Sequence, residues 1–154
     1  MRDYTTTNLD LETLAHKMKI NLIGIYSKDK LPQKCYVGSY IINLEDNDAG
    51  SGTHWCALYI TQKKEILYFD SFGMPPPREI KVFVNYKPIA INTRTIQNIN
   101  STLCGFYCLY FLKYIETNLN NKIKSIFEIY DNFLNIFRFD TKRNEDMVKN
   151  YFGL

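Results

Sequence analysis

Two apolar runs that lie close together constrain the fold of this chain more than any other feature. Residues 55–61 and 65–70 are mainly apolar, and only Gln62, Lys63 and Lys64 separate them. Two strand-length runs joined by a short polar turn are typical of a β-hairpin. Because the apolar residues follow one another without alternation, both faces of the strands should be buried. The sequence therefore predicts an antiparallel hairpin at the centre of a sheet.

Polar residues lie at the two ends of this hairpin. His54 directly precedes the first run, and Asp70 ends the second. A tight hairpin brings the start of its first strand beside the end of its second, so we expect these two side chains to be neighbours at one end of the sheet. A carboxylate there would fix the imidazole tautomer and favour its protonated form. The only other histidine, His16, lies among lysines and is expected on the surface.

A cysteine opens the longest apolar segment of the chain. Residues 103–117 are apolar nearly all round, which predicts a central buried helix. Cys104 lies in its first turn, where the positive end of the helix dipole favours a thiolate. Gly105 follows and leaves room for a close backbone approach. Gln97, seven positions before the cysteine, is a candidate oxyanion donor together with the Cys104 N–H.

The remaining pattern predicts a single α+β domain over residues 1–154. The expected elements are a helix from Asn8 to about Lys19, strands at 22–26, 39–44 and 93–97, a short helix at 78–84, and amphipathic helices at 123–137 and 144–151. The apolar fraction of 45% and charged fraction of 23% are typical of a globular protein.

Composition also narrows the class of protein. Four cysteines are too few for a small disulfide scaffold, so we expect a reducing compartment, with Cys56 and Cys108 packed in the core. No C-x2-C pair indicates a zinc site, and no G-x-S-x-G elbow or P-loop occurs. No run has the length of a membrane span, and residues 1–7 lack the apolar core of a signal peptide. A net charge of +3 permits nucleic-acid contact without indicating it.

Three segments together resemble the adenain family of cysteine proteases, the adenovirus maturation proteases. They are residues 52–55 (GTHW), 67–73 (LYFDSFG) and 97–108 (QNINSTLCGFYC), and residues 22–32 add a weaker likeness. The same order occurs in related proteases of virophages and polinton-like elements, and the wider clan includes the SUMO-deconjugating proteases. The resemblance implies a papain-like or adenain-like fold, with an antiparallel-rich central sheet packed by helices and the nucleophile at the N-terminus of a buried helix.

The resemblance also implies roles for individual residues. Cys104 would be the nucleophile, His54 the general base and then acid, Asp70 the group that orients the imidazole, and Gln97 an oxyanion donor. An extended substrate is expected near Gly52, Trp55 and Gly105. The implied activity is that of a viral cysteine endopeptidase, which cleaves capsid and structural precursor proteins during virion maturation in the virion and the host cell interior.

Some properties of the family are not carried over. Adenain has Glu where this chain has Asp70, a change that the wider clan accepts, and this chain is shorter between Asp70 and Cys104. Adenain is activated by a disulfide-linked viral peptide and by DNA, but no clear counterpart of the disulfide partner occurs here. We expect no cofactor and no metal, and neither a peptide nor a DNA activator follows from the sequence.

Three alternatives to a maturation protease stay open. A protease that removes ubiquitin-like modifiers would use the same chemistry on a folded substrate. An acetyltransferase could use the same order of catalytic residues, although no basic pocket for acetyl-CoA is evident. A binding module on the same scaffold would have lost catalysis, which the complete set of four polar residues disfavours.

Overall fold

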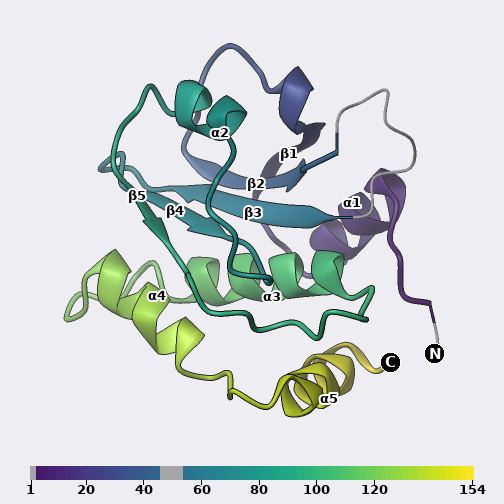
Figure 1. Ribbon diagram of the computed structural model, residues 1–154. Helices are drawn as coiled ribbons and strands as arrows, with labels where there is room; N and C mark the ends of the chain where they lie inside the picture. Colours follow the sequence, from purple (N-terminus) through teal and green to yellow (C-terminus); the bar gives the residue numbers. More distant parts are fainter. Residues whose placement is uncertain (1–2, 46–53) are drawn as a thin grey trace.

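The computed structural model describes residues 3–45 and 54–154, and its centre is a five-stranded mixed sheet (Figure 1). The strands are β1 (Leu22–Ser27), β2 (Gly38–Asn43), β3 (Trp55–Ile60), β4 (Ile66–Phe69) and β5 (Ile89–Ile91), and their spatial order follows the sequence. β2 and β4 pair antiparallel with β3, whereas the outer pairs β1–β2 and β4–β5 are parallel.

The predicted hairpin is confirmed as β3 and β4. Ala57 pairs with Phe69 and Ile60 with Ile66, and every residue of both strands is buried. β3 is the middle strand of the sheet, so its side chains pack on both faces. This register places His54, just before β3, and Asp70, just after β4, at one end of the sheet.

Four helices of the described residues lie on one side of the sheet. They are α1 (Asn8–Lys17), α3 (Cys104–Thr117), α4 (Ile126–Leu134) and α5 (Thr141–Phe152), and α3 lies directly beneath the strands (Figure 1). α4 and α5 pack on α3. The predicted central helix is confirmed, because most residues of α3 are buried in one cluster with the inner side chains of β3 and β4. Aromatic rings fill this layer, and Phe69 stacks on Phe111 with ring centroids 5.0 Å apart.

The opposite face of the sheet has a thinner cover. α2 (Arg78–Phe83) lies there beside the one-turn helix η1 (Lys28–Lys30), and Ile80 and Val84 complete a second apolar cluster with the outward side chains of the strands (Figure 1). α2 also forms the crossover that makes β4 and β5 parallel. The three prolines before it end the loop that leaves Asp70.

Several sequence expectations need correction. Residues 93–97 are not a strand; the last strand is β5, and the segment after it is held by hydrogen bonds to the loop after β4, including Ile96 N–H to Ser71 O (2.8 Å). The sheet is mixed rather than antiparallel-rich, because the sequence pattern does not reveal the two parallel edge pairs. The α+β class itself is confirmed.

Helix ends also differ from those expected. α1 is capped by Thr7 rather than Asn8, since the Thr7 side chain accepts from Asp10 N–H while the Asp10 carboxylate accepts from Thr7 N–H. α4 begins at Ile126, where Ser125 caps it, and α5 begins at Thr141 after the Asp140 cap. Within residues 3–45 and 54–154, no helix has the length and apolar character needed to span a membrane.

Candidate active site

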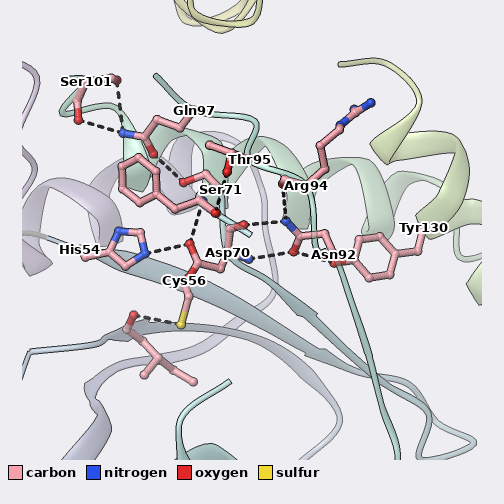
Figure 2. A network of polar contacts seen from close by, with 12 residues as sticks. His54, Cys56, Asp70, Ser71, Asn92, Arg94, Thr95, Gln97, Ser101 and Tyr130 are labelled. Carbon is pink, nitrogen blue, oxygen red and sulfur yellow. Dashed lines mark hydrogen bonds and ion pairs between the residues drawn. The ribbon is translucent and has the colours of Figure 1, made fainter. Parts of the chain in front are cut away.

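The expected neighbours at the end of the hairpin form a direct polar pair. His54 Nε2 and Asp70 Oδ1 are 2.8 Å apart. Figure 2 shows the two side chains pointing toward one another. The Asp70 carboxylate is fully buried, while 19% of the His54 side chain is exposed. A buried carboxylate beside an imidazole stabilises the imidazolium and holds one ring nitrogen in a fixed direction.

The electrostatics of His54 favour its charged form. Burial by itself lowers the pKa of His54, but its hydrogen bonds with the Asp70 carboxylate and the Cys104 side chain, together with the charges of both groups, outweigh burial and raise the pKa to about 9. Since Asp70 occupies Nε2, Nδ1 is the ring nitrogen left for the thiol. The structure therefore brings Cys104, His54 and Asp70 together. The hairpin pattern predicts the proximity of His54 and Asp70, and the place of Cys104 follows from the resemblance.

The thiol comes from the first turn of the central helix. Cys104 is the first residue of α3, and 4% of its surface is exposed. The N–H groups of a first helical turn lack intrahelical acceptors and form the positive end of the helix dipole. A negative charge on the sulfur or on a nearby oxygen is stabilised there.

The fourth expected residue is close to the other three but bonded differently from the expectation. Gln97 is 1% exposed, its Oε1 accepts from Ser71 Oγ (2.5 Å), and its Nε2 donates to Ser101 O (3.0 Å) and Ser101 Oγ (3.2 Å). Ser101 Oγ in turn accepts from Leu103 N–H (3.1 Å). Gln97 thus links the loop after Asp70 to the start of α3, and its amide would have to release Ser101 to reach an oxyanion.

The three residues expected to contact the substrate, Gly52, Trp55 and Gly105, have different surroundings. Trp55 is 2% exposed in the core, and its indole N–H donates to Thr6 O (3.3 Å), so little of the ring faces a substrate. Gly105 is buried against the N-terminal segment, and a Cβ on it would overlap the side chains of Thr6 and Leu11. The close approach predicted for this glycine is therefore made by the chain's own N-terminal segment. Gly52 lies outside the described residues.

Two residues at the site were not singled out from the sequence. Phe72 lies over the imidazole, with ring centroids 4.9 Å apart, and its N–H donates to Asp70 Oδ1 (2.9 Å). Asn92 is 2% exposed and is bonded to the backbone of Asp70 (Figure 2). The available signal for Asn92 was weak, since it is a polar residue directly after the apolar triplet 89–91.

The other three thiols have different surroundings. None of the four cysteines forms a disulfide. Cys56 and Cys108 are fully buried, and burial raises the pKa of both thiols strongly. Burial also raises the pKa of the partly buried Cys35. Among the described residues no cluster of three or more His, Cys, Asp or Glu side chains could hold a metal ion.

Comparisons with known proteins give a limited result. No protein-family model matches the chain, and no curated protein matches it. Among solved structures, the crystal structure of Se-Met ASFV pS273R protease is similar with a TM-score of 0.39 and 20% sequence identity. The similarity covers 65% of this chain and 44% of that protein, so this chain spans less than half of its length.

Proposed function

We propose that this protein is a cysteine endopeptidase with Cys104 as its nucleophile. The observation that supports this most directly is the buried His54–Asp70 pair at 2.8 Å, whose imidazole also interacts with the Cys104 side chain at the start of α3. A thiol, a base and a carboxylate that orients the base are the three groups that thiolate acyl transfer requires.

The reaction begins from the ion pair of Cys104 thiolate and His54 imidazolium. The sulfur attacks the carbonyl carbon of the scissile peptide, the C–S bond forms, and the π electrons move to the oxygen. When the tetrahedral intermediate collapses, the C–N bond breaks and His54 Nδ1 gives its proton to the leaving amine. Water then attacks the thioester while His54 takes one of its protons, the C–S bond breaks, and the carboxylic acid product leaves the Cys104 thiolate and the His54 imidazolium as at the start.

The oxyanion is stabilised by the backbone N–H of Cys104 and the Gln97 amide. Loss of one such donor typically lowers the rate about a hundredfold. Gln97 Nε2 donates to Ser101 O and Ser101 Oγ in this structure, so a change at one of these contacts would turn an amide hydrogen toward the oxyanion. Catalytic hydrogen bonds often tighten only in the substrate complex.

The substrates that we propose are viral capsid and structural precursor proteins. The support is the resemblance of residues 52–55, 67–73 and 97–108 to the adenain family, in which a histidine, an acidic residue, a glutamine and a cysteine follow one another in the same order. The two substrates of a cleavage assay are a viral capsid precursor protein and a fluorogenic conjugate of a ubiquitin-like modifier. Cleavage of the first and not the second supports precursor processing, and the reverse result assigns a modifier protease.

Two cysteine variants test the nucleophile. Cys104→Ala should abolish hydrolysis and leave the thermal unfolding midpoint unchanged. Cys108→Ala, one turn further along α3, should still hydrolyse the substrate. Iodoacetamide labelling with mass-spectrometric readout should modify Cys104 before the two buried thiols. Hydrolysis by purified Cys104→Ala would refute the assignment.

A further inference from the structure

The side chain of Asn92 holds the backbone of Asp70 from both sides. Asn92 Oδ1 accepts from Asp70 N–H (3.1 Å), and Asn92 Nδ2 donates to Asp70 O (2.6 Å). Figure 2 shows the Asn92 side chain beside Asp70. Its Nδ2 is also 3.5 Å from Arg94 O. Both residues are buried, so these bonds are shielded from competing water.

The strand register explains why an amide is suited to this position. β4 and β5 are parallel, with Tyr68 opposite Ile91, so Asn92 follows the last residue of β5 beside the end of β4. A side-chain amide offers one acceptor and donor hydrogens, like a peptide group. Beyond the end of β5 the Asn92 side chain, in place of a strand backbone, forms these hydrogen bonds with Asp70. The pairing of β4 with the β5 side of the sheet thus continues for one residue.

The Asp70 carboxylate depends on this backbone for its direction. Asp70 lies outside β4, yet its Oδ1 has to meet His54 Nε2 at 2.8 Å. The bond from Phe72 N–H to the same oxygen also requires the turn after Asp70 to keep its shape. Because the side chain of Asp70 is short, a small rotation of its backbone would displace the carboxylate from the ring.

We propose that Asn92 is a positioning residue that fixes the Asp70 backbone and thereby aims the Asp70 carboxylate at His54. The effect of Asn92 on catalysis rests on the proposed function, whereas its effect on the position of Asp70 follows from the hydrogen bonds between the two residues. Asn92 touches neither the thiol nor the imidazole in the contacts that the described residues make, so it acts through Asp70.

Tyr130 of α4 supports Asn92 in turn. Its hydroxyl lies 2.5 Å from Tyr68 O and 3.2 Å from Asn92 Oδ1. The hydroxyl thus connects Tyr68, near the end of β4, to the side-chain amide of Asn92. Removing this hydroxyl alone is a milder change than replacing Asn92.

The test is the titration of His54 by NMR. The chain has two histidines, and the exposed His16 on α1 serves as the internal reference. The charged groups that act on His54 are Asp70 and Cys104. We expect Asn92→Leu, an apolar replacement of similar shape, to lower the pKa of His54 by about one unit, a tenfold loss of proton affinity. In the peptidase assay kcat should fall while KM stays within about twofold.

A matched control separates positioning from general destabilisation. Asn144 is also 2% exposed, and its side chain bonds to Ile96 O (3.0 Å), Arg138 O (2.8 Å) and Arg138 N–H (2.8 Å), with no contact to Asp70 among the described residues. Asn144→Leu should lower stability and leave the His54 titration unchanged. In an Asp70→Asn background, Asn92→Leu should have little further effect on that titration.

The outcomes separate this inference from the proposed function. An unchanged His54 pKa in folded Asn92→Leu overturns the positioning role, as does a shift that persists in the Asp70→Asn background. If Asn92→Leu does not fold, Asn92→Ala decides, and an unchanged His54 pKa in that variant overturns the role equally. A lowered pKa without any peptidase activity in the wild type would refute the proposed function and leave the positioning role standing.

Discussion

Replacing Asp70 by Asn tests the electrostatics of the site with little change in shape. Asp70 Oδ1 accepts from His54 and from Phe72 N–H, whereas Oδ2 is buried without a hydrogen-bond partner among the described residues. An Asn oxygen can accept both bonds while its NH2 group takes the place of Oδ2. The substitution therefore removes mainly the charge.

The structure gives the size of the expected effect. A rise of the His54 pKa from 6.5 to about 9 corresponds to roughly 3 kcal/mol in favour of the protonated ring. Asp70 supplies the largest of the favourable contributions, and burial opposes them. We therefore expect Asp70→Asn to return the pKa of His54 toward 6.5 or below, as measured by NMR against His16.

The same shift predicts the pH dependence of stability. Because the folded pKa is raised, the stabilisation is fully present below pH 6.5 and is lost as the pH rises through about 9. Urea unfolding at a series of pH values should show a decline of roughly 3 kcal/mol over this window in the wild type and a flatter profile in Asp70→Asn. Identical profiles for the two proteins, or a His54 midpoint that the substitution leaves in place, would refute the reasoning.

Two further predictions concern the surroundings of the site. In urea unfolding, Gly73→Ala should destabilise the fold by about 1–3 kcal/mol more than Gly153→Ala. Both glycines have positive φ, but only a Cβ at Gly73 would meet backbone atoms, 2.8 Å from Arg94 C. Equal losses of stability would contradict this. Tyr107→Phe should cost about 1–3 kcal/mol by removing the hydroxyl that donates to the buried Glu145 of α5, and the conservative Glu145→Gln should cost less.

Sequence reasoning worked best where a local pattern and a tertiary requirement coincide. The hairpin is buried on both sides, so its apolar runs follow directly from its central position, and its short turn fixes which ends meet. That is why the proximity of His54 and Asp70 was predictable. The long apolar helix was predictable for a similar reason, because α3 packs on several elements at once.

The edges of the sheet and the support of the site were not predictable in the same way. β5 has only three residues and no alternating pattern, so the sequence predicts a strand at residues 93–97 instead. Trp55 was expected at the substrate, but an indole N–H paired with Thr6 O shows that the N-terminal segment covers it. A buried acceptor far along the chain leaves no trace in the local sequence.

The sequence by itself determined the central hairpin, the buried helix that begins at Cys104, and the adjacency of imidazole and carboxylate, because each depends on short-range periodicity and one tight turn. Only the tertiary structure decided that Gln97 is bonded to Ser101, that Phe72 covers the imidazole, and that Asn92 holds Asp70. These contacts join segments separated by loops, and their geometry depends on how helices and strands pack rather than on the spacing of residues along the chain.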